Sequence, residues 1–286
     1  MRARVPGSSA NLGPGFDTLG VALALYTEVT VEPADSLALT VTGEGADLPA
    51  DEEHLAVQVV RSVLGHDRVA ITVTSEIPVS RGLGSSAALA VASAAAAGLH
   101  DTVQLIALVA RLEGHGDNAA ASVLGGLVTA SLQDGDVLAH ALVLDPELSF
   151  VAVIPDRRLP TVEAREVLPF LVPRDDAVFN LGRLGALIAG LADHRYLRPS
   201  AGRDRLHQPQ RTPLFPESAA LLDALVGGGA LMSCWSGAGP TLLGVCWRAE
   251  SASVLEAASS AMASLGVDGR VIALEADRTG LVVTER

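Results

Sequence analysis

The sequence predicts an α+β protein that is divided into two halves. The chain has 286 residues, enough for two domains, and 49% of its residues are apolar, enough for a substantial core. Segments with alternating apolar residues are interspersed with segments of helical spacing. The pattern resets at Asp145-Pro146, so we expect a boundary near residue 147 and domains at 1–147 and 148–286.

The first half is expected to contain strands and helices in alternation. Alternating apolar residues predict strands at 2–5, 23–31, 37–41, 69–74 and 125–131. Helical spacing or a run of alanine predicts helices at 53–64, 87–97 and 103–112. The segment Pro6–Gly20 is rich in glycine and proline, which indicates a turn-rich loop.

The second half is expected to follow the same alternation. Strands are predicted at 149–154, 242–247, 269–274 and 280–283, and helices at 161–168, 177–193, 217–226 and 252–265. The polar stretch Arg195–Pro213 is too long for an ordinary connection. Loops of that length in compact domains are usually functional or mobile, so one of these two is expected for this stretch.

Composition excludes several classes of protein. The net charge of −13 disfavours binding to nucleic acid, whose backbone it would repel. No long apolar run and no basic-then-apolar leader is present, so we expect neither membrane insertion nor export but a cytoplasmic protein. All 20 basic residues are arginine, which excludes lysine-dependent phosphate loops and Schiff-base enzymes. Cys234 and Cys246 are expected to be buried free thiols.

A glycine-rich segment, Pro78-Val-Ser-Arg-Gly-Leu-Gly-Ser-Ser-Ala-Ala, lies between a predicted strand and the alanine-rich helix. Gly82 and Gly84 allow tight turns and close approach of another group. Ser85 and Ser86 fall where a helix begins, so their hydroxyls are expected to cap its free amides. Unpaired N–H groups and the helix dipole form a site for anions, so phosphate binding is predicted. The alternative is a turn into a well-capped helix.

Two further glycine-rich segments contain candidate ligand contacts. Pro6–Gly20 includes Asn11 and Asp17, which either face a ligand or form Asx turns. Near the C-terminus, Ser236-Gly-Ala-Gly-Pro-Thr241 precedes a strand, and its glycines either allow close approach of another group or form a tight turn.

These three segments together resemble the signatures of the GHMP kinases, and Pro6–Gly20 resembles the first motif of the homoserine kinase branch of that family. The resemblance implies an N-terminal ribosomal-S5-like domain, a C-terminal ferredoxin-like domain, and ATP bound between them. It implies that the nucleotide is contacted by Pro78, Ser80, Arg81, Gly82, Leu83, Gly84, Ser85, Ser86, Ala87, Gly237 and Gly239.

The segment Glu113-Gly-His-Gly-Asp-Asn118 also resembles a homoserine kinase motif. The resemblance implies that Glu113 and Ser86 hold Mg²⁺, although Glu113 could instead be a solvated helix end. Asn118 stands where several GHMP kinases have a catalytic Asp. An amide is not a useful proton acceptor, so phosphoryl transfer without a protein base is expected, with Glu113, Ser86 and Asn118 as the catalytic residues.

The resemblance implies an amino-acid pocket in which two arginines hold a carboxylate, because the guanidinium fork can bond both oxygens. Arg165 and Arg211 occupy the matching positions, and surface ion pairs are the alternative for both. The substrate-binding residues implied are Asn11, Asp17, His115, Asp117, Arg165 and Arg211.

The implied reaction is transfer of the γ-phosphoryl group of ATP to the side-chain hydroxyl of L-homoserine, yielding O-phospho-L-homoserine for threonine biosynthesis. The alternatives are another small hydroxylated acceptor such as mevalonate or a sugar, or a nucleotide-binding regulatory paralogue. The family resemblance also suggests a homodimer. Three features depart from the family pattern: Gly116 in place of Pro, a short 98–103 connection, and Gln210 in place of an aromatic residue.

Overall fold

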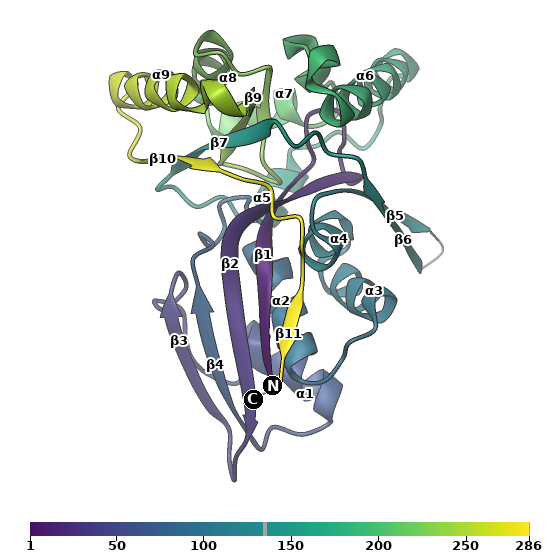
Figure 1. Ribbon diagram of the computed structural model, residues 1–286, viewed down its shortest axis with the longest axis vertical. Coiled ribbons are helices and arrows are strands. Elements are labelled where there is room, and N and C mark those ends of the chain that lie inside the picture. The colour runs from purple at the N-terminus through teal and green to yellow at the C-terminus, as the bar shows by residue number, and fades with distance from the viewer. Residues whose placement is uncertain (134–135, 286) are drawn as a thin grey trace.

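The protein has an α+β fold in which helices pack on two sheets, as predicted (Figure 1). The computed structural model describes residues 1–133 and 136–285. The first sheet contains seven strands: β1 (Arg2–Ala10), β2 (Leu19–Pro33), β3 (Ala38–Gly43), β4 (Val69–Ser75), β5 (Leu127–Gln133), β6 (Asp136–Leu142) and β11 (Val282–Thr284). Their order is β11-β1-β2-β4-β3, with β5 paired to β2 and β6 paired to β5. Only β3 and β4 are parallel.

The two longest strands of this sheet extend further than predicted. β1 continues through Pro6 to Ala10 with a register shift between Pro6 and Gly7, so the expectation of a loop starting at Pro6 is wrong. Serines can continue the strand here because Ser8 and Ser9 are buried with hydrogen-bonding partners for their hydroxyls. β2 is long enough to pair with β4 at one end and with β5 at the other.

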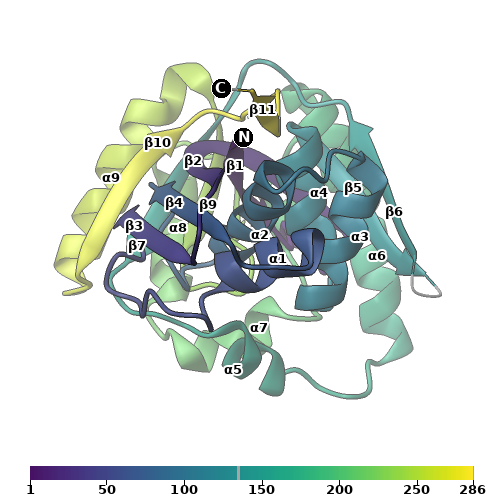
Figure 2. The same ribbon diagram turned by 90° about the horizontal axis from the view of Figure 1, so that it is seen from below.

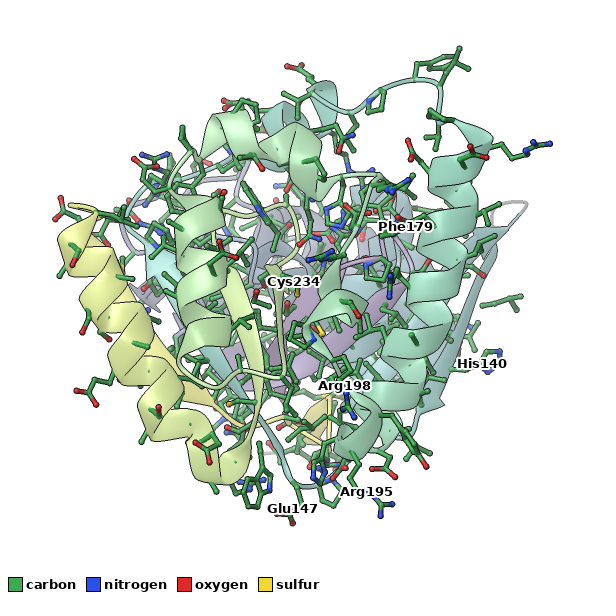
Figure 3. All side chains as sticks on the ribbon, turned by 90° about the horizontal axis from the view of Figure 1, so that it is seen from above. His140, Glu147, Phe179, Arg195, Arg198 and Cys234 are labelled. Carbon is green, nitrogen blue, oxygen red and sulfur yellow. The ribbon has the colours of Figure 1, made fainter. Side chains whose placement is uncertain are left out.

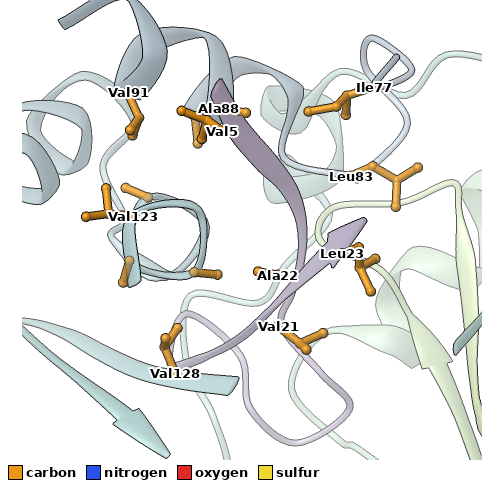
Figure 4. Packing of buried hydrophobic residues seen from close by; sticks show 14 of the residues in the cluster. Val5, Val21, Ala22, Leu23, Ile77, Leu83, Ala88, Val91, Val123 and Val128 are labelled. Carbon is orange, nitrogen blue, oxygen red and sulfur yellow. The ribbon is translucent and has the colours of Figure 1, made fainter. Parts of the chain in front are cut away.

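The helices of the first half are α1 (Leu55–Leu64), α2 (Ser85–Ala96), α3 (Thr102–Glu113) and α4 (Asp117–Leu124). α2 and α4 pack against the first sheet, α1 packs on α2, and α3 packs on α2 and α4. Small side chains let α2 and α4 pack closely on the strands, where residues such as Ala88, Val91 and Val123 meet Val5 and Val128 (Figure 4). α4 was not predicted, because it is short and buried on every side and therefore shows no amphipathic pattern.

The second sheet has four strands in the order β10-β7-β9-β8. They are β7 (Leu148–Pro155), β8 (Met232–Trp235), β9 (Leu242–Trp247) and β10 (Gly269–Leu274). Phe150, Ala152 and Ile154 of β7 join the core of the first half, whereas Val151 and Val153 pack under the outer helices. Because both faces of β7 are covered, the whole strand is buried.

The helices of the second half are α5 (Thr161–Glu166), α6 (Arg174–Ala192), α7 (Gln208–Arg211), α8 (Ser218–Gly227) and α9 (Ser251–Ser264). Short 3₁₀ turns occur at His194–Tyr196, Pro199–Gly202, Thr212–Leu214 and Arg248–Glu250. The segment 195–213 is therefore structured rather than an open loop. It contains α7 and the turn at Pro199–Gly202, and the turns at His194–Tyr196 and Thr212–Leu214 overlap its two ends.

The last strand of the chain returns to the first sheet, where β11 pairs with β1 (Figure 1). An isolated bridge between Leu23 and Ala276 guides the chain back. The domain boundary at 147/148 stays a prediction. Residues near the C-terminus, those of β11, complete the sheet of the first half.

Both cysteines are free and buried, as expected. Cys234 is fully buried, while Arg195 and Arg198, labelled with it in Figure 3, are exposed. Among the described residues, no helix is long and apolar enough to cross a membrane.

Candidate active site

A cleft of about 680 Å³ contains most of the polar residues singled out by the sequence. Its walls come from the loop before α2, the end of α3, α5, α7 and the turn after β8. The two short helices α5 and α7 are neighbours here (Figure 2), joined by a hydrogen bond from Arg211 Nε to the Ala164 carbonyl. Residues far apart in the chain therefore meet around one cavity. The predicted site residues that line it are Asn11, Ser80, Arg81, Gly82, Gly84, Ser85, Ser86, Glu113, His115, Asn118, Arg165, Arg211 and Gly237.

The glycine loop is held in a conformation that requires glycine at two places. Gly82 and Gly84 have φ of +75° and +68°. A Cβ on Gly82 would lie 2.2 Å from the Ser236 carbonyl oxygen, and one on Gly84 would lie 2.2 Å from Ser8 Oγ. The loop is therefore packed against β1 and against the turn that follows β8.

α2 begins at this loop without a side-chain cap. Gly84 is the N-cap residue and its neighbours Ser85 and Ser86 are the first two residues of the helix. The prediction that these serine hydroxyls cap the helix is therefore wrong, because they lie one position too far along the chain. The first N–H groups of a helix have no partner within it, so this end can receive an anion.

Several predicted nucleotide residues support the loop rather than line the cavity. Leu83 and Ala87 are buried in the core, and Gly239 packs against the Trp235 ring. Pro78 is also buried. The Arg81 guanidinium lines the cleft but donates hydrogen bonds to the carbonyls of Val79, Pro155 and Asp156, so it ties the loop to the end of β7.

Glu113 and Ser86 present hard oxygen atoms on one wall of the cleft. Glu113 is the last residue of α3, and its carboxylate accepts a hydrogen bond from the Ser86 hydroxyl. Burial raises the pKa of Glu113, although the charge of His115 and the hydrogen bond from Ser86 oppose the rise. Carboxylate and hydroxyl oxygens suit Mg²⁺, and a bound cation would offset the cost of burying this carboxylate.

His115 and Asp117 are paired with each other. His115 Nδ1 lies 3.0 Å from Asp117 Oδ1, which also accepts the N–H of Asn118. Burial lowers the pKa of His115, but Asp117 and Glu113 outweigh it, so the pKa is raised overall. The other carboxylate oxygen, Asp117 Oδ2, is buried without a hydrogen-bond partner among residues 1–133 and 136–285. Gly116, which departs from the family pattern, is the N-cap residue of α4.

Asn118 is held in one orientation by Ser8. The Ser8 hydroxyl lies 2.9 Å from Asn118 Oδ1 and donates to it. Because the amide oxygen is engaged by a buried serine, the amide nitrogen is the atom left for the cleft that Asn118 lines. The side chain therefore offers N–H groups rather than a proton acceptor.

Asp17 and Arg165 form a bidentate ion pair at 3.1 and 2.6 Å. Asn11 Oδ1 accepts the N–H of Asp17 at 2.7 Å, and both residues have positive φ, so the loop between β1 and β2 is tightly folded. Asn11 therefore does not form a simple Asx turn, because its side chain bonds the main chain of Asp17, six residues further along. Asp17 belongs to this cluster although it does not line the cavity itself.

Arg211 is completely buried, unlike Arg165. It donates to the carbonyls of Ala164 and Gly237 and to Nδ1 of His207. Burial and the charge of Arg165 lower the pKa of Arg211 to about 10. The alternative of a surface ion pair fails for this residue, since it is buried and its hydrogen-bond acceptors are neutral.

Three parts of the site were not predicted from the sequence. Ser8 orients Asn118, and His207 orients Arg211. In the sequence, each stands inside a segment that was singled out for other residues: Pro6–Gly20 for Ser8, and the segment around Arg211 for His207. The third part is an apolar wall beside the glycine loop, formed by Leu48, Pro49, Leu55 and Leu89. Nothing in the sequence distinguishes these residues from ordinary core positions.

Comparisons with known proteins match segments of both halves of the chain to one family. The family described as GHMP kinases N terminal domain matches residues 53–126, and the family described as GHMP kinases C terminal matches residues 179–264. A homoserine kinase of Desulfitobacterium hafniense is 36% identical over 295 residues, covering 99% of this chain and 99% of that protein. A homoserine kinase of Moorella thermoacetica is 41% identical over 293 residues, covering 98% of each.

Solved structures share the fold over the whole chain. A homoserine kinase from Cytophaga hutchinsonii superposes with a TM-score of 0.86 at 23% identity, covering 99% of this chain and 97% of that one. A mevalonate kinase from L. major, solved with R-mevalonate, has a TM-score of 0.67 at 15% identity and covers 91% of each chain. At such identities the likeness concerns the fold, so the acceptor has to be argued from residues in the cleft.

Proposed function

Because the chain belongs to the homoserine kinase branch of the GHMP kinase family, we propose that it transfers the γ-phosphoryl group of ATP to the side-chain hydroxyl of L-homoserine in the cleft described above. One observation carries the proposal: the uncapped start of α2, the Glu113–Ser86 oxygens and the two arginines all face a single cavity. In this proposal the cavity would bring a phosphate chain, a cation and an amino acid within reach of one another.

The phosphate chain of ATP would lie on the glycine loop. Main-chain N–H groups of residues 82–86 would donate to its oxygens, and the positive end of the α2 dipole would add to the attraction. The apolar wall of Leu48, Pro49, Leu55 and Leu89 adjoins the loop and suits a purine base. This arrangement accounts for nucleotide binding by a chain that has no lysine.

Magnesium would be held by Glu113 and Ser86 together with phosphate oxygens. Bound there, Mg²⁺ supplies charge neutralisation for the transferring phosphoryl group. The role of Glu113 is then to hold the cation close to the start of α2. Its carboxylate is suited to this role because its environment is desolvated and Ser86 fixes its orientation.

The acceptor would bind between Asp17 and Arg165 and replace their direct ion pair by one contact to each. A zwitterionic amino acid presents a carboxylate for Arg165 and Arg211 and an ammonium for Asp17, so both members of the pair keep an opposite charge. An acceptor with a carboxylate alone, such as mevalonate, would leave Asp17 without a partner. The residues on this side therefore favour an amino acid with a hydroxylated side chain.

No side chain in the proposed reaction removes the hydroxyl proton. Asn118 offers N–H groups to the cleft, because Ser8 occupies its oxygen. Phosphoryl transfer proceeds through a loose transition state in which positioning and charge neutralisation provide most of the acceleration. The proton would pass to the transferred phosphate or to solvent, and Asn118 would orient the reacting groups.

Measurement of ADP release from the purified protein tests this function. We expect Mg²⁺-dependent release with L-homoserine and none above background with L-serine, mevalonate or galactose. Turnover with mevalonate or galactose instead would identify another acceptor. Binding of ATP without turnover on any acceptor would identify a regulatory paralogue.

The metal assignment is tested separately with Glu113→Gln, which keeps the size of the side chain and removes its charge. We expect loss of turnover and loss of Mn²⁺ binding measured by electron paramagnetic resonance, with an unchanged circular dichroism spectrum. Unchanged Mn²⁺ binding would contradict the assignment. A cytoplasmic location and a homodimer stay predictions, and light scattering coupled to size-exclusion chromatography tests the second.

A further inference from the structure

We propose that His207 is a positioning residue for the acceptor, because its ring holds the Arg211 guanidinium and joins it to the loop that carries Asn11 and Asp17. This inference rests on the proposed function, in which Arg211 receives the acceptor carboxylate. His207 is completely buried and does not line the cleft, so it acts through Arg211 and not on the substrate.

The two ring nitrogens of His207 have opposite partners. Nε2 lies 2.7 Å from the Gly13 carbonyl oxygen, and Nδ1 lies 3.0 Å from Arg211 Nη1. A carbonyl only accepts and a guanidinium only donates. Nε2 must therefore carry the proton and Nδ1 must present a lone pair, which fixes a neutral ring in one tautomer.

The surroundings of His207 agree with a neutral ring. Asp204 Oδ2 lies 3.6 Å from Nε2, but this oxygen already accepts the main-chain N–H groups of His207 and Gln208. The ring of Phe16 stacks on the imidazole with centroids 5.2 Å apart. Burial is the main reason that the pKa of His207 is lowered to about 4, and the Arg211 charge adds to it while Asp204 opposes it.

As a result, one edge of the Arg211 guanidinium has no hydrogen-bond partner among the described residues. Of the five guanidinium N–H donors, Nε bonds the Ala164 carbonyl, and Nη1 bonds His207 and the Gly237 carbonyl. Within the described residues no hydrogen bond uses Nη2. The protein therefore fixes the plane of the guanidinium and leaves Nη2 for a ligand in the cleft.

The same ring links both sides of the acceptor pocket. Gly13 lies between Asn11 and Asp17 in the β1–β2 loop, and Arg211 closes α7. Loss of the Nδ1 acceptor would free the guanidinium to rotate, which weakens capture of a carboxylate. The nucleotide side, built on α2, shares no hydrogen bond with His207 and would be spared.

Two amide substitutions each keep one of the two hydrogen bonds of the His207 ring and remove the other. His207→Asn places an acceptor oxygen near the position of Nδ1 and loses the bond to Gly13. His207→Gln can reach Gly13 but loses the acceptor for Arg211. We expect His207→Gln to raise the KM for homoserine about tenfold, the worth of one charge-assisted hydrogen bond, with the KM for ATP unchanged. His207→Asn should keep the KM for homoserine close to the wild-type value.

Three controls complete the experiment. Each variant loses one hydrogen bond, so their melting temperatures should fall by similar amounts although their KM values differ. His194→Gln, which alters a histidine paired with Asp145 outside the cleft, should leave both KM values unchanged. Arg211→Lys should raise the KM for homoserine, because an ammonium lacks the planar fork of N–H donors with which a guanidinium binds a carboxylate.

Equal KM values in the two His207 variants would overturn the proposal, since a packing role alone predicts no difference between them. An unchanged KM in Arg211→Lys, with active wild-type protein, would overturn the role of Arg211 on which it rests. A wild-type protein without homoserine-dependent turnover would instead contradict the proposed function. If the variants do not fold, ¹⁵N-histidine spectra of the wild-type protein decide: we expect a neutral His207 with Nε2 protonated at pH 7, and a protonated Nδ1 would overturn the proposal.

Discussion

The side of the cleft proposed to bind phosphate is built from main chain, whereas the side proposed to bind the acceptor is built from charged side chains. On the first side, Gly82 and Gly84 bring the loop against β1 and the turn after β8, and the proposed anion site needs no charged side chain. On the acceptor side, Asp17, Arg165 and Arg211 are held by partners from both halves of the chain.

This difference predicts how each side fails. A site made of N–H groups depends on the path of the backbone, so one added methyl group is enough to destroy it. A site made of paired charges tolerates small changes of shape, but loss of one charge leaves its partner in a poorly solvated place. The following predictions test that contrast, beginning with the largest effect.

Gly84→Ala should reduce turnover most. The new Cβ would lie 2.2 Å from Ser8 Oγ and would disturb the start of α2. We expect a loss of about 100-fold or more in kcat/KM, since misplacement of reacting groups by about 1 Å costs that much. Gly65→Ala is the matched control, because Gly65 also has positive φ but a Cβ there would meet nothing within 4 Å. Steady-state kinetics of both variants measure the difference, and equal losses would contradict the clash.

Asp17→Asn should have a smaller and more selective effect. It removes the bidentate partner of Arg165 and the proposed partner of the acceptor ammonium. We expect the KM for homoserine to rise at least about tenfold, with the KM for ATP unchanged. Asp193→Asn removes an aspartate paired with Arg195 away from the cleft and serves as the control. A rise in the KM for ATP would show that the two sides are not separate.

The pH dependence of unfolding should report the buried His207. Its pKa is lowered to about 4 in the folded protein, against 6.5 for an unperturbed side chain. Between these values the unfolded chain binds more protons, so stability falls as the pH is lowered through this window. The His207 contribution to the free energy of unfolding should decrease by about 2 kcal/mol between neutral pH and pH 5. Urea titrations of wild type and His207→Asn measure this contribution together with that of Asp204, whose pKa depends on the charge of His207. A difference between the two proteins that does not change with pH would contradict a neutral buried ring.

The smallest effect is expected from a thiol reagent. Burial raises the pKa of both Cys234 and Cys246 to about 12, so neither forms a thiolate at neutral pH. Ellman's reagent should leave the folded protein unreacted and fully active, and should titrate both cysteines in guanidinium chloride. Rapid reaction of a folded thiol would show that the second sheet opens more readily than its packing indicates.

The sequence was most informative where neighbours in the chain are also neighbours in space. The glycine loop and the start of α2 form one contiguous segment, so the glycine-dependent turn into the helix could be predicted from residues 78–88 alone, and phosphate binding there stays a prediction. The role of Ser8 could not be predicted, because only the fold brings Asn118 of α4 beside β1. For His207 the contact with Gly13 likewise depends on the fold, although Arg211 is only four residues away in the sequence. β8 was missed because it has only four residues and lies in a glycine-flanked segment.

The return of the last strand to the first sheet has a consequence for the folding of the chain during its synthesis. β11 is made after every other element, yet it forms an edge of the sheet whose inner strands are made first. A nascent chain therefore exposes the open side of β1 until the second half has been translated. The order of translation thus makes completion of the first sheet depend on the half of the chain that follows it.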